Sequence, residues 1–214
     1  MAKKPAPDET AAPLVPRAGG VDALREAAAG CRACELWERG TQTVFGAGPQ
    51  GARIVFVGEQ PGNEEDLAGA PFVGPSGKLL DQGLEAAGID RSLAYVTNVV
   101  KHFKWEPRGK RRIHAKPNAR EIAACRPWLD AELAAVKPLA VVCLGATAAQ
   151  ALLGRGFRVT QSRGELLERT GLAPWVMATV HPSSVLRAPD DESRRRERAR
   201  FFEDLAKLAP LVRR

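Results

Sequence analysis

The chain has 214 residues, of which 44% are hydrophobic and 27% charged, a balance typical of one globular domain with an apolar core rather than of a disordered chain. It holds no run of about eighteen apolar residues, which excludes an ordinary membrane-spanning helix. Its formal net charge of +7 favours an anionic partner over a cationic one.

The N-terminal segment is predicted to be a flexible tail over residues 1–17. Its sequence, MAKKPAPDETAAPLVPR, is rich in Pro and Ala and lacks the apolar stretch of a secretion signal. We therefore expect residues 18–214 to form a single domain and the protein to be cytoplasmic.

Four short apolar runs predict buried strands of a parallel sheet, because such strands are covered on both faces. They are RIVFVG (53–58), AYVTNVV (94–100), LAVVCLG (139–145) and WVMATV (175–180). Helical patterns separate them at 76–88, 117–136 and 146–154, and a charged helix is expected within 193–208. The alternation predicts an α/β fold, a three-layer α/β/α sandwich around a four-stranded, mainly parallel sheet.

Polar or glycine-rich segments follow three of these strands, where α/β sheets place their ligand sites. They are GEQPGNEEDLAGAPFVGPSGKLLD after the first strand, TNVVKHF after the second and HPSSVLR after the fourth. The GPSGK stretch does not fit a phosphate-binding P-loop, since Phe72 stands where that motif needs glycine and Leu79 where it needs Ser or Thr. A nucleoside-triphosphatase is therefore excluded.

The whole net charge lies in residues 101–120. This window holds eight Lys or Arg and one acid, Glu106, so it carries +7 while the rest of the chain sums to zero. A gathered excess is typical of a site where a polyanion docks, although a solvated basic loop without a partner would give the same pattern. Within it, five cations of RGKRRIHAKP (108–117) surround His114, which is either a phosphate contact or a nucleophile.

The chain has four cysteines, Cys31, Cys34, Cys125 and Cys143. A cytoplasmic location argues against disulfides, and four thiolates suit either zinc or an iron–sulfur cluster, between which spacing does not decide. Cys125 in a helix and Cys143 in an apolar strand could instead be inert core thiols.

The motifs GEQPG, PFVGPSGKLLD, TNVVK and HPSSVLR, preceded by Cys-x-x-Cys, resemble the uracil-DNA glycosylase superfamily, specifically its family 4, which carries an iron–sulfur cluster. The resemblance covers about residues 31–205. Two features depart from ordinary family 4 proteins: Gln60 replaces an alanine, and the segment KRRIH (110–114) is inserted. Both are similar to UdgX proteins, the group that excises uracil and then becomes covalently joined to DNA.

The resemblance implies the roles of the pocket residues. Glu59 would stabilise the sugar cation or activate water, and His181 would donate a hydrogen bond to uracil O2. Asn98 would read the O4 and N3–H edge of the base, Phe72 would stack on it, and Gly58 would border it. Gln60 would orient Glu59 or a water. The alternatives are structural: a helix-cap neighbour for Glu59, a turn residue for His181, a structural hydrogen bond for Asn98 and a core aromatic for Phe72.

Uracil-containing DNA, single-stranded or duplex, is the expected partner of a monomeric protein. Ser183 and Ser184 suit phosphate contacts, and Leu186 is either a wedge for the gap left by a flipped nucleotide or a buried leucine. The predicted DNA contacts are Ser76, Lys110, Arg111, Arg112, Ser183, Ser184, Leu186 and Arg187; His102 is also placed near DNA, without a chemical role.

Three functions follow from this interpretation. In the first, the protein excises uracil and His114 then attacks the sugar, which ends turnover. In the second, it is an ordinary turnover glycosylase whose basic loop binds phosphates. In the third, it is a non-catalytic iron–sulfur protein that binds DNA. The resemblance favours the first, with a structural [4Fe–4S] cluster held by Cys31, Cys34, Cys125 and Cys143.

Overall fold

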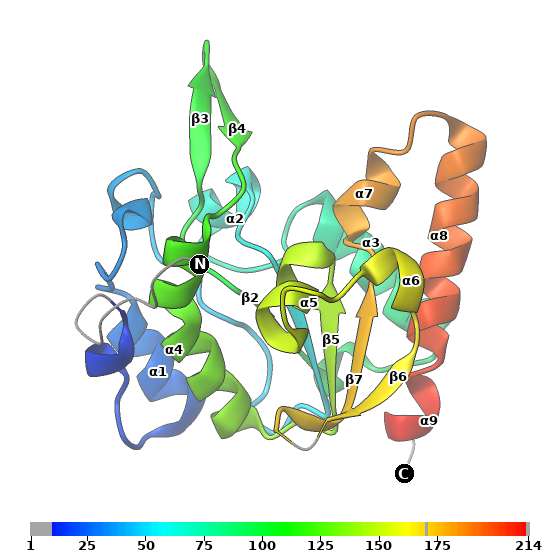
Figure 1. Cartoon of the computed structure of the whole chain (residues 1–214), viewed down its shortest axis with the longest axis horizontal. Coiled ribbons are helices and arrows are strands. Elements are labelled where there is room, and N and C mark those ends of the chain that lie inside the picture. The colour runs from blue at the N-terminus through cyan, green and yellow to red at the C-terminus, as the bar shows by residue number, and fades with distance from the viewer. Residues whose placement is uncertain (1–9, 170, 213–214) are drawn as a thin grey trace.

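A computed structural model describes residues 10–169 and 171–212. Its centre is a five-stranded sheet in the order β2-β1-β5-β7-β6 (Figure 1). The strands are β1 Ile54–Gly58, β2 Ala94–Asn98, β5 Ala140–Leu144, β6 Leu166–Arg169 and β7 Ala173–Thr179. Strands β2, β1, β5 and β7 run parallel to their neighbours, whereas β6 is antiparallel to β7. The predicted α/β fold and its four parallel strands are confirmed, and the sheet has one strand more than predicted.

The fifth strand, β6, was not predicted from the sequence because it is an edge strand. It pairs only with β7, and its register shifts between Glu168 and Arg169. Leu166 and Leu167 are half-buried and Glu168 is exposed, so the segment lacks the continuous apolar run of a central strand.

Helices cover both faces of the sheet, which makes the three layers (Figure 1). In β1, Val55 and Val57 face one layer while Ile54 and Phe56 face the other. The first layer contains α1 Gly20–Ala28, α4 Ala119–Val136, α5 Ala146–Leu153 and α6 Val159–Ser162; the second contains α3 Pro75–Ala86, α7 Pro182–Leu186, α8 Asp191–Ala206 and α9 Ala209–Val212. None of the helices in the described ranges is long and apolar enough to cross a membrane.

Shorter elements connect these layers. They are the helix α2 Asn63–Ala68 and the 3₁₀ helices η2 Ala12–Leu14, η3 Glu35–Glu38 and η4 Arg91–Leu93. Residues 1–9 of the predicted tail lie outside the described residues. Ala11, within the segment predicted as a tail, is fully buried, and its backbone N–H donates to the carbonyl of Ala124 at 2.8 Å. The described chain therefore packs against α4 from residue 11 onward rather than from residue 18.

Helix α4 begins at Ala119, with Asn118 as its N-cap, close to the predicted start of the helical pattern at residue 117. Asn118 Oδ1 accepts from the backbone N–H of Glu121 at 2.9 Å, and Glu121 Oε2 accepts from the N–H of Asn118 at 2.7 Å. This capping box fixes the start of the longest helix. It thereby sets the positions of Cys125 and Glu132, which face the core.

The basic segment is a β-hairpin rather than a loop. Strands β3 Trp105–Arg108 and β4 Arg111–His114 pair antiparallel and project from the body beyond the carboxyl ends of the central strands (Figure 1). Gly109 has φ +59°, which the tight turn between the strands favours. The register opposes His114 to Trp105 and so places His114 at the base of the hairpin. The hairpin is mostly exposed and has no alternating apolar pattern, and sequence analysis therefore predicted a loop.

Candidate active site

A pocket of about 730 Å³ opens at the carboxyl ends of the parallel strands. Residues that follow β1, β2, β5 and β7 line it together with the first turns of α2, α3 and α5 and the end of β4. The predicted site residues in its lining are Glu59, Gln60, Phe72, Ser76, Asn98, His114, His181, Ser183 and Arg187. The structure thus brings together residues from four parts of the sequence at one edge of the sheet.

Phe72 and Asn98 line this pocket, and both lie close to Gly58 at the end of β1; we call this part of the pocket the base slot. A Cβ at Gly58 would overlap Asn98 Oδ1 and lie 2.9 Å from Phe72 Cζ, so only glycine leaves room for both side chains. The Phe72 ring also faces the His181 ring, with centroids 6.3 Å apart and planes inclined by 29°. The slot therefore offers an aromatic face and an amide edge, as a planar base requires.

The backbone of Phe72 is held in a strained conformation. Its φ of +58° is rare for an aromatic residue. Glu65, a buried residue of α2, accepts hydrogen bonds from the N–H of Gly74 at 2.8 Å and the N–H of Gly62 at 3.0 Å. It thus ties the Phe72 loop to the segment after β1. Glu65 was not among the predicted site residues, although its place three residues after Gly62 is that of a capping-box acid.

His181 is held as a neutral hydrogen-bond donor. Burial, with smaller effects from Arg187 and His114, lowers its pKa to about 4. Its Nδ1 accepts from the backbone N–H of Ser183 at 3.1 Å and lies 2.8 Å from the Ser183 hydroxyl. Since Nδ1 is the acceptor, the neutral ring carries its proton on Nε2. This tautomer suits the predicted role of donating to a carbonyl oxygen.

Glu59 stands between two side chains that contact its two oxygens. The hydroxyl of Thr147 donates to Oε2, and His114 Nε2 lies 3.3 Å from Oε1. Thr147 is buried in the first turn of α5, directly after β5. The three strand ends that were predicted to form the site did not include the end of β5. The Gly-Ala-Thr that follows the apolar run of β5 was the available signal.

Gln60 binds the base of the hairpin rather than Glu59. Its Nε2 donates to the carbonyls of Lys104 at 3.1 Å and Ala115 at 3.0 Å, and its Oε1 accepts from the N–H of Lys104 at 3.1 Å. Lys104 precedes β3 and Ala115 follows β4, so one side chain fastens both ends of the hairpin to the segment after β1. Gln60 therefore helps to fix the position of His114 at the base of the hairpin.

The three cations of the KRRIH segment have different environments. Arg112 is mostly buried: it pairs with Asp66 at 2.6 Å, donates to Asn63 Oδ1 at 2.8 Å and lies over the Phe103 ring. It is thus engaged within the protein, and its contact with DNA stays a prediction. Lys110 and Arg111 are exposed near the tip, with no ion-pair or hydrogen-bond partner among the described side chains.

The other predicted DNA contacts lie in the pocket or next to it, on α3, on α7 and directly after α7. The Ser183 hydroxyl is engaged with His181, and the Ser184 hydroxyl donates to the carbonyl of His181 at 2.8 Å. Leu186 is 37% exposed at the end of α7, which favours a wedge over a core leucine. Arg187 and Ser76 line the pocket. His102, in contrast, is buried and lies 3.0 Å from the Thr43 hydroxyl, so the suggestion that it touches DNA was wrong.

Three of the four thiols lie in one region. Trp128 Nε1 donates to Cys31 Sγ at 3.3 Å, and the backbone N–H of Lys101 donates to Cys125 Sγ at 3.3 Å. Burial raises the pKa of Cys125 to about 12; among smaller effects, Lys101 lowers it and the nearby Cys34 raises it.

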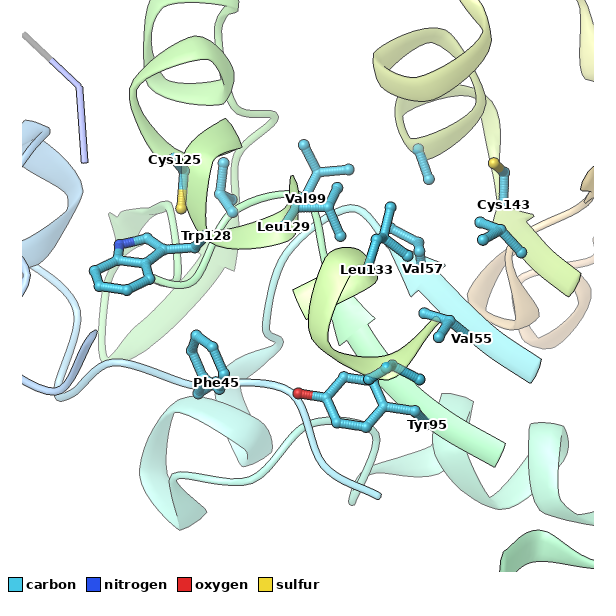
Figure 2. Close-up of a cluster of buried hydrophobic side chains, with 14 of the residues drawn as sticks. Phe45, Val55, Val57, Tyr95, Val99, Cys125, Trp128, Leu129, Leu133 and Cys143 are labelled. Carbon is cyan, nitrogen blue, oxygen red and sulfur yellow. The ribbon is translucent and has the colours of Figure 1, made fainter. Parts of the chain in front are cut away.

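Cys143 does not join these thiols. It lies on β5 beneath α5, and Figure 2 shows it at the far end of the core cluster from Cys125, with Val99, Leu129 and Leu133 drawn between them. The structure therefore does not bring the four predicted cysteine ligands together, and spacing alone does not tell a ligand from a core thiol. Within residues 10–169 and 171–212, no three His, Cys, Asp or Glu side chains lie close enough to hold a single metal ion.

Comparison with known proteins agrees with this geometry. Residues 45–206 match the family model described as the uracil DNA glycosylase superfamily. The chain is 39% identical over 165 residues to a type-4 uracil-DNA glycosylase of Archaeoglobus fulgidus, a match that covers 74% of this chain and 79% of the relative. It is 41% identical over 166 residues to one of Thermotoga maritima, covering 77% and 82%. A third, of Pyrobaculum aerophilum, is 33% identical over 189 residues, covering 86% and 90%.

Replacing Thr147 by valine should slow the reaction at the pocket without unfolding the protein. The substitution keeps the shape of the side chain but removes the hydrogen bond to Glu59. We expect the single-turnover rate on uracil-containing DNA to fall by about 10- to 100-fold, the size of one hydrogen bond to a charged group. Thr147→Ser, which keeps the hydroxyl, is the matched control. Equal rates for the valine and serine variants would show that the contact has no role.

Stability should fall as the solution is acidified. Unfolded His181 binds a proton below about pH 6.5, whereas the folded residue does so only near pH 4, so the unfolded state is favoured increasingly across this interval. Thermal melts from neutral pH down to about pH 4.5 should show a falling Tm. His181→Gln should flatten part of this dependence; His102, whose pKa burial also lowers to about 4, accounts for a second part. An unchanged slope in His181→Gln would contradict the assignment.

Proposed function

The chain belongs to the uracil DNA glycosylase superfamily, and from this premise we propose that it excises uracil from DNA and that His114 then bonds covalently to C1′ of the sugar. The observation that carries the second step is the distance of 3.3 Å between His114 Nε2 and Glu59 Oε1. The residue predicted to stabilise the sugar cation thus lies beside the residue predicted to attack it. Uracil excision is the first step of repairing such DNA.

Uracil excision uses the base slot together with the side chains of His181 and Glu59. Uracil stacks on Phe72 and lies over Gly58, where the amide of Asn98 meets its O4 and N3–H edge. As the bond between C1′ and N1 breaks, negative charge develops on the base and positive charge on the sugar. The Nε2–H of His181 stabilises the first and the carboxylate of Glu59 stabilises the second.

The covalent step replaces attack by water. The imidazole of His114, with its proton on Nδ1, donates the electron pair of Nε2 to C1′ of the sugar cation, while the carboxylate of Glu59 beside it stabilises the positive charge until the bond forms. The alkylated ring then releases its Nδ1 proton, which passes through solvent to the departed uracil anion, so that neutral uracil and a neutral sugar–imidazole bond are the products. Thr147 holds the other carboxylate oxygen and keeps Oε1 turned toward His114.

Rigid attachment of the hairpin supports this role for His114. Gln60 fastens both ends of the hairpin, and Arg112 ties its second strand to the buried carboxylate of Asp66. Because these contacts keep the imidazole at the pocket, its effective concentration exceeds that of a free reactant, and it competes with water. Lys110 and Arg111 are left for DNA phosphates.

We further propose that Cys31, Cys34 and Cys125 hold a [4Fe–4S] cluster. The chain has no fifth cysteine, so with Cys143 in the core the fourth ligand is not a thiolate. The resemblance of the motifs to family 4, which carries an iron–sulfur cluster, favours a cluster over zinc at these thiols. Such a cluster would supply structural support, joining the segment before η3 to α4, and no step of excision passes through it.

A denaturing gel tests the covalent step. The protein is incubated with an oligonucleotide that contains one deoxyuridine and is then denatured by SDS and heat. We expect a stable protein–DNA band from the wild type, and uracil release with a free abasic site from His114→Ser. The double variant Lys110→Ser/Arg111→Ser should keep the covalent band and lose only DNA affinity, most strongly at low salt.

Other outcomes of this gel assign other functions. A wild type that releases uracil and leaves only free abasic DNA is an ordinary turnover glycosylase whose hairpin clamps phosphates. A wild type that binds the oligonucleotide and releases no uracil is a DNA-binding protein without catalysis. A covalent band that persists in His114→Ser would assign the bond to another nucleophile.

Metal analysis tests the thiol assignment. Cys143→Ala should retain about four iron atoms per chain, with matching acid-labile sulfide and visible absorbance, whereas Cys125→Ala should lose them. Circular dichroism should show that both variants remain folded. Loss of iron from a folded Cys143→Ala would return that residue to the ligand set, and zinc in place of iron would overturn the cluster.

A further inference from the structure

A buried ion pair lies behind the base slot, outside the pocket. Lys101 and Glu132 have exposed fractions of 1% and 0%, and Lys101 Nζ lies 2.5 Å from Glu132 Oε2. Lys101 ends the TNVVK motif after β2, and Glu132 comes from the middle of α4. The reaction proposed above uses only Asn98 of this motif and does not account for the lysine.

The pair is fully hydrogen-bonded. Lys101 Nζ also donates to Thr97 Oγ1 at 2.6 Å and to the carbonyl of Asn98 at 2.8 Å, so all three of its protons have acceptors. Glu132 accepts from the Tyr95 hydroxyl at 2.9 Å, from the Thr97 hydroxyl and from the backbone N–H of Gly46 at 3.1 Å. Burial and the charge of Glu132 raise the pKa of Tyr95, which keeps its hydroxyl protonated as a donor.

Stability alone is a poor explanation for this arrangement. Removing two charges from water carries a large desolvation cost, and well-packed apolar replacements of buried pairs are often neutral or stabilising. The Lys101 ammonium adds a directed contact, because it donates a hydrogen bond to the main-chain carbonyl of Asn98, whose side chain lines the base slot.

The turn after β2, which Lys101 closes, is hydrogen-bonded to the end of β1 and to Glu59, which follows it. The N–H of Val99 donates to the carbonyl of Gly58 at 2.9 Å, and the N–H of Val100 donates to the carbonyl of Glu59 at 3.1 Å. Residues 98–101 therefore set the backbone on both sides of the slot. A shift of the Asn98 carbonyl would move the Asn98 amide relative to Gly58, where contact is too close to allow even a methyl group.

We propose that the Lys101–Glu132 ion pair positions the Asn98 amide for uracil recognition. Lys101 and Glu132 are positioning residues: they act through the carbonyl of Asn98 and touch neither the base nor the sugar. This inference rests on the proposed uracil excision and deepens it, because it names what holds the residue that reads the base.

The test is a mutant cycle between the ion pair and Asn98. Lys101→Met/Glu132→Gln removes both charges and keeps the approximate shape, so no unpaired buried charge remains. Its single-turnover rate of uracil release is measured in the wild-type background and in Asn98→Ala, together with inhibition by free uracil. We expect a loss of about tenfold or more in the wild-type background, with weaker inhibition by uracil, and little further loss in Asn98→Ala.

A purely structural role predicts a different result. The double variant would then lower the rate by the same factor in both backgrounds, or not at all, and either result overturns the inference. Val136→Ala, a core substitution one turn further along α4, is the control for general destabilisation and should leave uracil inhibition unchanged. Iron content is measured in every variant, since the N–H of Lys101 contacts Cys125.

Two further arms complete the design. If the double variant does not fold, Thr97→Val replaces it, since this change removes only the hydroxyl that joins Lys101 and Glu132. The same non-additivity with Asn98→Ala is then expected, and additivity overturns the inference. A wild type without uracil release would refute the proposed function itself, whereas active wild type with unaffected variants refutes only the role of the ion pair.

Discussion

The structure depends on how the ends of β1 and β2 are joined. Two main-chain hydrogen bonds, from the N–H groups of Val99 and Val100 to the carbonyls of Gly58 and Glu59, continue the parallel ladder past the last residues of the strands. They bring the Asn98 side chain over Gly58, which must be glycine because a Cβ would overlap it. They also direct Glu59 into the pocket, where the first turn of α5 and the base of the hairpin meet it. Base recognition and sugar chemistry therefore share one rigid segment of backbone.

Buried carboxylates hold the hairpin and the backbone behind the base slot in place. Asp66 on α2 has no exposed surface, and it binds Arg112 of β4 together with the N–H of Thr41. Glu132 gathers four donors behind the slot. In both cases a carboxylate inside the protein fixes a cation that, in the sequence, looks available for DNA. Lys110 and Arg111, which have no partner among the described side chains, lie where the hairpin projects farthest from the body (Figure 1). Position within the fold, rather than charge, separates structural cations from those available to phosphate.

Much of the site could be predicted because each strand end carries its own short motif. Glu59, Asn98 and His181 follow apolar runs directly, and the geometry of parallel sheets brings such positions to one edge. Thr147, Glu65 and Lys101 support the site through hydrogen bonds: Thr147 to Glu59, Glu65 to the N–H groups of Gly62 and Gly74, and Lys101 to the carbonyl of Asn98. Their local signals are those of ordinary helix starts, caps and turns, and these signals do not indicate contacts between distant segments. The cysteines show the same limit. Cys125 and Cys143 are both buried, yet α4 turns the first toward Cys31 and Cys34, whereas β5 points the second into the core.

The sequence by itself determined the α/β class, the four parallel strands and the edge of the sheet at which the pocket forms, because continuous apolar runs and the polar segments that follow them are local signals. The tertiary structure decided the rest. It made a hairpin from the basic segment and placed His114 beside Glu59. It also engaged Gln60 and Arg112 in contacts that hold this hairpin, and it kept Cys143 apart from the other three cysteines. Each of these outcomes depends on contacts between residues far apart in the chain, and such contacts are set by packing and hydrogen-bond geometry that no local pattern encodes.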